Sequence, residues 1–121
     1  MTPRRLLIVD DEEDIREGLR EVFEDEGYEV ATAANGREAL QALRGRELPC
    51  GVILDLVMPV LSGNEVYDAV KADELLSSVP LLISTSDPSR APPGSLVMKK
   101  PIDLEALIAA VARLCGRAHH Q

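Results

Sequence analysis

The sequence predicts an α/β fold, a doubly wound three-layer sandwich in which helices cover both faces of a parallel sheet. Four short apolar runs are continuous rather than alternating, which is typical of strands that are buried on both faces. The segments between these runs carry apolar residues at helical spacing. Because crossovers between parallel strands are right-handed, alternating strands and helices of this kind build a sandwich.

Five strands are expected. The four continuous apolar runs are residues 6–9, 52–54, 81–83 and 96–98. A fifth and weaker strand is expected at 29–33, where alanines and a threonine accompany Val30. These smaller and more polar residues fit a position near an edge of the sheet.

The first and last helices are predicted from their apolar stripes. In the first, the stripe begins at Ile15 and includes Phe23, and Gly27 is a plausible stop signal. The last helix is expected to open at Asp103 and to end at Gly116. Its stripe consists of Leu104, Leu107, Ile108, Val111 and Cys115.

The two middle helices are predicted from their starting signals. Asn35 is followed three residues later by Glu38, and Ser62 by Glu65. A short polar residue and a glutamate at this spacing can each bond a backbone N–H at the start of a helix. Helices are therefore expected after 35 and after 62.

The connection between the fourth and fifth strands is unusual. Residues 86–95 read SDPSRAPPGS, and their three prolines and one glycine exclude an ordinary helix. This crossover should be a loop or at most a helical turn. With four full helices instead of five, one face of the sheet should be less covered.

Length and composition exclude several classes. The 121 residues make one domain, the apolar runs are too short to span a membrane, and no signal peptide is recognisable. The net charge of −8 should repel nucleic acid. We expect a cytoplasmic domain that binds neither nucleic acid nor membrane.

The cysteines and histidines add little to the prediction. Cys50 and Cys115 stand far apart in the sequence and are expected to be separate buried apolar residues. His119 and His120 lie at the end of the chain and indicate a frayed tail rather than a metal site.

Polar residues follow four of the predicted strands. Asp10 and Asp11 follow the first, Asp55 ends the third, Thr85 ends the fourth after Ser84, and Lys99 and Lys100 end the fifth. The carboxyl ends of parallel strands share one edge of the sheet, where ligands bind in such folds. Three carboxylates at one edge repel each other by about 4 kcal/mol per pair at 4 Å and an effective dielectric of 20. A cation is therefore expected among them, and an all-oxygen site suits Mg²⁺.

A carboxylate beside Mg²⁺ and a lysine is what a phosphoryl-accepting aspartate requires, because both cations neutralise the oxygens of the transferred group. The plainer interpretation is that Asp10 and Asp11 only cap the first helix and that Lys100 is a solvated surface residue. The joint occurrence of these residues at four strand ends favours the phosphoryl-accepting site.

At this point the sequence resembles the receiver domain of two-component response regulators. The matching stretches are LLIVDDEEDIR, VILDLVMPVLSGNEV, PLLISTS and KKPIDLEAL, which together cover essentially the whole chain. The resemblance implies a flavodoxin-like sheet with strand order 2-1-3-4-5, atypical in that the fourth helix is missing. It also implies that residues 1–121 form a single receiver domain with no output domain.

By this resemblance, Asp55 is the phosphoacceptor, with Thr85 as the switch hydroxyl and Lys100, before a proline commonly in the cis form, as the cationic partner. Asp10, Asp11, Asp55 and the backbone carbonyl of Val57 would hold Mg²⁺. Gly63 would admit a close turn after the acceptor, although an ordinary helix start explains it equally well. The implied protein is a signalling phosphoacceptor rather than an enzyme, and at most catalyses its own phosphorylation and dephosphorylation.

The resemblance implies a phosphorelay in which a sensor histidine kinase or a phosphotransfer protein is the donor and an unknown downstream protein is the target. One alternative is a receiver-like binding module that acts without phosphorylation. Another is a Mg²⁺-dependent phosphohydrolase, but such enzymes typically have a second aspartate where Val57 stands. Val97 replaces the usual aromatic switch residue, and Val57 and Asp87, at positions that tune the lifetime of the phosphoryl group, leave that lifetime open.

Overall fold

Five parallel strands form one sheet in the order β2-β1-β3-β4-β5. The computed structural model describes residues 4–45, 47–58 and 60–115. The strands are β1 (Arg5–Val9), β2 (Glu29–Ala33), β3 (Gly51–Asp55), β4 (Leu81–Thr85) and β5 (Leu96–Lys99). All five lie where the sequence predicted strands, and the weaker β2 occupies an edge of the sheet as expected.

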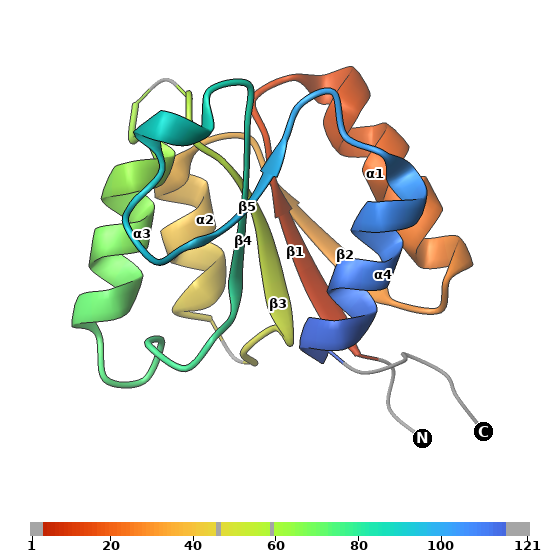
Figure 1. Ribbon diagram of the computed structural model, residues 1–121. Helices are drawn as coiled ribbons and strands as arrows, with labels where there is room; N and C mark the ends of the chain where they lie inside the picture. Colours follow the sequence, from red (N-terminus) through yellow and green to blue (C-terminus); the bar gives the residue numbers. More distant parts are fainter. Residues whose placement is uncertain (1–3, 46, 59, 116–121) are drawn as a thin grey trace.

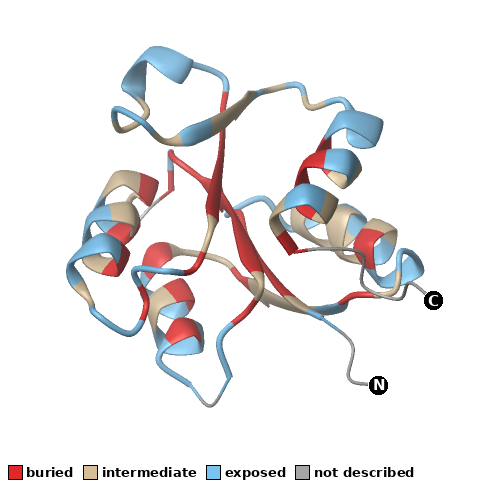
Figure 2. Ribbon diagram, turned by 60° about the horizontal axis from the view of Figure 1, so that its bottom comes forward, coloured by how far each residue is buried: buried red, intermediate tan, exposed pale blue. Residues whose placement is uncertain are grey.

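Helices cover the sheet on both faces, which confirms the three-layer sandwich. The helices are α1 (Glu13–Asp25), α2 (Gly36–Leu43), α3 (Gly63–Ala72) and α4 (Leu104–Cys115). Figure 1 shows α2 and α3 on one face and α1 and α4 on the other. Successive residues along the central strands point to opposite faces of the sheet. The sheet therefore separates two apolar clusters. The buried residues therefore concentrate along the central strands (Figure 2).

The predicted helix starts are present. The Asn35 side chain accepts a hydrogen bond from the backbone N–H of Glu38 at 2.9 Å. Ser62 and Glu65 form a complete capping box, and the Asp103 carboxylate accepts from the backbone N–H groups of Glu105 and Ala106. The predicted end of α4 at Gly116, like the histidines of the C-terminal tail, lies outside the described residues.

Two predicted core positions are instead partly exposed. Ile15 in α1 and Leu104 in α4 keep 38% and 44% of their surface accessible. Both lie in the first turn of their helix, next to the carboxyl edge of the sheet. The rest of each stripe is directed at the sheet, and Phe23 and Leu107 are fully buried.

The β4–β5 connection is a loop with one short 3-10 turn, η1 (Pro88–Arg90). The sequence prediction of at most a helical turn is therefore confirmed. The loop partly replaces the missing helix, because Ala91 packs with Val97 against the α2–α3 side of the core. Lys100 and Pro101, which follow β5, are joined by a cis peptide bond.

The prediction that the two cysteines are separate buried residues is wrong. Cys50 and Cys115 form a disulfide with a Cα–Cα distance of 5.0 Å. Cys50 directly precedes β3, and Cys115 ends α4, which runs antiparallel to the strands. Both positions therefore lie at the amino end of the sheet, although 65 residues separate them in the sequence. Among the described residues, no helix is long and apolar enough to cross a membrane.

Candidate functional site

The ends of β1 and β3 bring three carboxylates together at the carboxyl edge of the sheet. Oxygen atoms of Asp10, Asp11 and Asp55 lie within 4.8 Å of one another. Asp10 and Asp55 are only 3% and 5% exposed, whereas Asp11 faces solvent. Parallel pairing of β1 with β3 places Val9 beside Leu54, so the residues that follow these two must be neighbours.

Lys100 provides the positive charge of the site. Its Nζ atom lies 3.4 Å from Asp10 Oδ2 and 3.4 Å from Asp55 Oδ1. The lysine follows β5, and its backbone N–H donates to the Thr85 carbonyl at 2.8 Å. This hydrogen bond continues the β4–β5 ladder by one residue and directs the lysine toward the carboxylates.

Burial and charge act in opposite directions on Asp55. Burial raises the pKa of its carboxyl, Lys100 lowers it and Asp10 raises it again, with the result that the pKa is about 6. For Lys100, burial alone would lower the pKa, but Asp55 and Asp10 together outweigh this effect and raise it. At neutral pH, Asp55 is thus mainly an anion and Lys100 a cation.

Hydrogen bonds to the backbone hold the carboxylates in place. The backbone N–H of Glu12 donates to Asp10 Oδ1 at 2.9 Å, and Arg16 donates to the Asp10 carbonyl at 2.8 Å. The backbone N–H of Val57 donates to Asp55 Oδ1 at 3.4 Å. Oδ1 of Asp55 therefore has both Lys100 and Val57 as partners, whereas no hydrogen bond reaches its Oδ2 from the described part of the chain.

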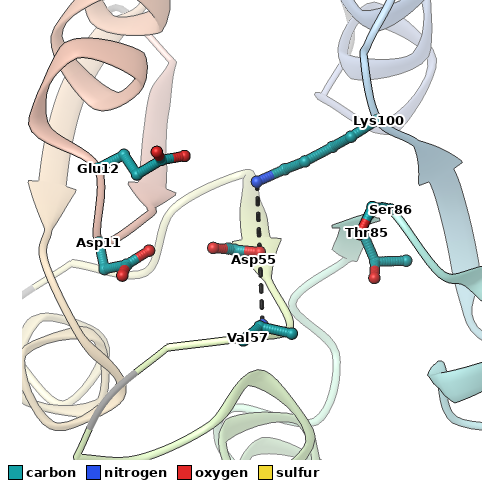
Figure 3. Close-up of a pocket in the computed structure, with 7 residues that line it drawn as sticks. All are labelled: Asp11, Glu12, Asp55, Val57, Thr85, Ser86 and Lys100. Carbon is teal, nitrogen blue, oxygen red and sulfur yellow. Dashed lines mark hydrogen bonds and ion pairs between the residues drawn. The ribbon is translucent and has the colours of Figure 1, made fainter.

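An open cleft of about 330 Å³ gives access to Asp55. We call it the acidic cleft; it is lined by Asp11, Glu12, Asp55, Val57, Thr85, Ser86 and Lys100. Figure 3 shows Asp11 and Glu12 on one side of Asp55 and Thr85 and Ser86 on the other. Sequence reasoning missed Glu12 and Ser86, although the run of five acids at 10–14 could have pointed to Glu12. Ser84, Lys99 and Asp87 do not line the cleft.

Thr85 is buried and its hydroxyl is engaged away from Asp55. Oγ1 accepts a hydrogen bond from the Asp87 N–H at 3.1 Å and donates to the Asp87 carbonyl at 3.4 Å. The Asp87 carboxylate accepts from the Ser89 hydroxyl at 2.6 Å, and this bond lowers the pKa of Asp87. Asp87 thus caps the 3-10 turn instead of facing the acidic cleft.

Gly63 allows α3 to begin directly against the phosphoacceptor candidate. A Cβ atom at this position would collide with the backbone carbonyl oxygen of Asp55 and lie 2.6 Å from the Leu56 Cα. The Gly63 N–H donates to the Leu56 carbonyl at 2.8 Å. Of the two explanations left open by the sequence, the structure therefore supports the close turn.

The donor set fits Mg²⁺. Asp10, Asp11 and Asp55 offer only oxygen atoms, one carboxylate is open to solvent, and the cleft has room for water ligands. Mg²⁺ prefers such sites because it keeps several of its waters. Val57 borders the cleft, and the ligation of a metal by its carbonyl stays a prediction.

Residues 6–112 match the response regulator receiver domain family. The chain belongs to this family. The receiver domain is 34% identical to the response regulator MprA of Mycolicibacterium vanbaalenii over 95% of this chain and 52% of that protein. It is 32% identical to the response regulator Rre1 of Synechocystis over 95% of this chain and 53% of the relative. The chain thus spans about half the length of these curated relatives.

Solved receiver structures have the same fold. The chemotaxis protein CheY4 of Vibrio cholerae is 31% identical, with a TM-score of 0.81 over 93% of this chain and 99% of the other. The response regulator TrrA of Thermotoga maritima, in complex with Mg²⁺ and BeF, is 33% identical, with a TM-score of 0.79 over 92% and 98% of the two chains. Receiver domains are the signalling phosphoacceptors of two-component systems rather than classical enzymes, they bind Mg²⁺ at an acidic pocket, and they interact with histidine kinases.

Proposed function

We propose that Asp55 of this receiver domain accepts the phosphoryl group, with the phosphohistidine of a sensor histidine kinase or a phosphotransfer protein as the donor. The position of Asp55 supports this role. Its carboxylate lies buried at the base of the acidic cleft, within 3.4 Å of the Lys100 ammonium, and the cleft opens to solvent. No other described aspartate combines burial with both a cationic partner and a place in the lining of the cleft.

The transfer forms one bond and breaks another. Asp55 Oδ2, which receives no hydrogen bond from the described residues, attacks the phosphorus atom as the P–N bond of phosphohistidine breaks. The imidazole leaves with the bonding electron pair, and Asp55 becomes an acyl phosphate. Lys100 and the Val57 N–H hold Oδ1 and thereby orient the attacking oxygen. When bound at Asp10, Asp11, Asp55 and the Val57 carbonyl, Mg²⁺ supplies positive charge that offsets the charge of the phosphoryl oxygens.

Thr85 and Lys100 then bind the new dianion. To donate to a phosphoryl oxygen, the Thr85 hydroxyl must give up its bond to the Asp87 carbonyl. Lys100 keeps its position between Asp10 and the modified Asp55. The phosphoryl group therefore acts directly on the loop that follows β4, which changes the affinity for a downstream protein. Hydrolysis of the acyl phosphate, catalysed by the domain itself, resets this state.

A phosphorylation-independent binding module is the second candidate function. The shortened crossover after β4 and Val97 in β5 support it, because the surface that usually responds to phosphorylation is altered here. In either case we place the domain in the cytoplasm, and its net charge of −8 supports the expectation that it does not itself bind nucleic acid.

Intact mass after incubation with acetyl phosphate and Mg²⁺ separates the two candidates. The wild-type chain should gain the mass of one phosphoryl group, and Asp55→Asn should gain none. Asp68→Asn, which removes an exposed carboxylate of α3 instead, is the matched control and should be phosphorylated like the wild type. Beryllofluoride with Mg²⁺ should shift the amide resonances around Asp55 and Thr85 in the wild type and in Asp68→Asn, but not in Asp55→Asn. An equal mass gain in the wild type and Asp55→Asn would exclude Asp55 as the acceptor, and no response in either protein would favour the binding module.

A further inference from the structure

A second cleft lies on the α2 side of the molecule and shares no residue with the acidic cleft. We call it the arginine cleft; its volume is about 240 Å³ and it is lined by Arg37, Leu40, Gln41, Arg44, Val60 and Leu61. The first three residues form one stripe along α2, Arg44 directly follows the helix, and the last two residues belong to the loop between β3 and α3. Figure 1 shows this loop reaching over the side on which α2 and α3 lie together.

The charge of the arginine cleft is opposite to that of the whole chain. Arg37 and Arg44 are exposed, and neither forms an ion pair with a carboxylate in the described ranges 4–45, 47–58 and 60–115. Seven residues separate them, which corresponds to roughly 10 Å along the helix axis. No acidic residue lines the cleft, although the net charge of the chain is −8. The cleft therefore presents two free guanidinium groups to a negatively charged partner.

Val60 adds an apolar group that the fold itself does not bury. Its side chain is 64% exposed, and its backbone adopts a φ of 71°. A β-branched residue in this left-handed region is strained. Because Val60 gains little from burial within the domain, the isolated fold gives no reason for a valine rather than a glycine there. A partner that covers the Val60 side chain would supply the free energy of apolar burial that the domain alone does not.

The floor of the arginine cleft is fixed before any partner binds. A Cβ atom on Gly36 would lie 2.7 Å from the Leu61 Cβ and 2.7 Å from a Val66 methyl group. The loop therefore packs directly on the first turn of α2, at a distance that only glycine permits. Leu40 and Leu61 are half-buried and present apolar surface between the two arginines. A preformed site of this kind loses little conformational entropy on binding.

We propose that the arginine cleft docks an acidic amphipathic helix of another protein. An apolar side chain of that helix would cover Val60 and Leu61, and carboxylates on either side of it would pair with Arg37 and Arg44. Helices that lay an apolar face into a groove are a common mode of peptide recognition. A nucleic acid fits poorly, because the cleft holds only two cations and no aromatic residue for base stacking. This inference is independent of phosphorylation at Asp55.

A designed helical peptide tests the proposal. The probe is a fluorescein-labelled peptide of about 20 residues, with leucines on one helical stripe and glutamates seven residues apart on its flanks. The control peptide carries lysine in place of each of these glutamates. By fluorescence anisotropy the acidic peptide should bind the domain and the basic one should not. Amide chemical-shift changes should centre on residues 37–44 and 60–61. Shift changes centred elsewhere, or equal binding of both peptides, would overturn the proposal.

Matched variants separate charge from fold. Arg37→Gln with Arg44→Gln should weaken binding about tenfold, as expected for two partly exposed ion pairs. Arg4→Gln with Arg113→Gln removes the same charge from exposed sites outside the cleft and should bind like the wild type. Equal weakening by both pairs would overturn the specific role of the cleft.

Val60→Gly tests the apolar contact separately from folding. A variant that lost binding because it unfolds would also lose stability, whereas this variant should gain stability. Glycine adopts the left-handed backbone without strain, so the variant should unfold at a higher urea concentration than the wild type. It should nevertheless bind the acidic peptide several-fold more weakly, because the apolar contact is lost. If binding were unchanged, Val60 would not contact the partner and the proposed docking mode would be wrong.

Discussion

The two ends of the sheet are built in opposite ways. At the carboxyl end, Asp10, Asp55 and Lys100 bring charges into a largely buried site. At the amino end, no described cluster of this kind occurs, and a disulfide between Cys50 and Cys115 ties the start of β3 to the end of α4. One end thus costs free energy of folding, and the other supplies it.

This difference shows how the same strands can serve chemistry and stability. The central strands carry buried apolar side chains along most of their length, and β3 ends in a carboxylate whose pKa burial has raised to about 6. In the proposed function this site binds a metal ion and a phosphoryl group, and burying its charges without them costs free energy of folding. The amino end of the sheet takes no part in the proposed function. A disulfide there therefore does not interfere with the site.

Loss of the disulfide should have the largest effect on stability. The chain-entropy relation gives about 4 kcal/mol at 25 °C for a bridge that closes a loop of this length, with 65 residues separating the two cysteines. Cys50→Ser with Cys115→Ser should therefore unfold at a much lower urea concentration than the oxidised wild type. The measurement is the free energy of unfolding from urea titrations.

Mg²⁺ affinity provides the control for this experiment. The disulfide lies at the other end of the sheet. Under conditions in which the double variant is folded, its affinity for Mg²⁺ should therefore equal that of the oxidised wild type. A large loss of affinity would show that the two ends are coupled and would contradict the division between them. Adding a reducing agent to the wild type should reproduce the stability of the variant.

The pH dependence of stability should reveal the cost of the carboxyl end. Burial raises the pKa of Asp55 in the folded state from 3.8 to about 6, with Lys100 opposing and Asp10 adding to the effect. Between these values the folded state binds more protons than the unfolded state, so the free energy of unfolding falls as the pH rises through this window. The full loss is at most about 3 kcal/mol and is reached above about pH 6.

Asp55→Asn isolates this contribution. Its stability should lack the fall between about pH 4 and pH 6, so that at neutral pH it exceeds that of the wild type without Mg²⁺. Saturating Mg²⁺ should stabilise the wild type more than the variant, because the cation binds the charged form of the carboxyl. Parallel pH profiles of the two proteins would show that the site is not strained.

The sequence was sufficient for features that depend on local pattern. Strand positions follow from continuous apolar runs, and the order of the acids and Lys100 along the chain placed them correctly at one edge of the sheet. The prolines of residues 86–95 excluded a helix there, as the 3-10 turn confirms. Each of these predictions uses information contained in a few consecutive residues or in the rule for parallel strands.

Features that depend on tertiary geometry could not be predicted. Nothing in the neighbourhood of Cys50 indicates that the end of a helix 65 residues later packs against it. The left-handed backbone of Val60 contradicts the preference of a β-branched residue. The engagement of Thr85 with Asp87 depends on the path of the loop after β4, which the proline-rich sequence leaves undetermined.

Gly63→Ala should disturb the carboxyl end by a smaller amount. The new methyl group would overlap the backbone of Asp55 and Leu56, and backbone atoms cannot move aside as a flexible side chain does. A loss of about 1–3 kcal/mol is expected for such overpacking, together with weaker Mg²⁺ binding because Asp55 shifts. Urea titration and Mg²⁺ titration of the same sample measure both effects. A loss of stability with unchanged Mg²⁺ affinity would show that α3 moves and Asp55 stays in place.

Gly18→Ala is the matched substitution and should have the smallest effect, of opposite sign. Gly18 lies within α1, and a Cβ atom there would meet nothing within 4 Å. Alanine should stabilise the helix by about 0.5–1 kcal/mol, because glycine loses more backbone entropy on folding. The same chemical change would thus stabilise one helix and destabilise another, the difference being the Asp55 backbone beside Gly63. A destabilising Gly18→Ala would contradict the open space that the structure shows beside Gly18.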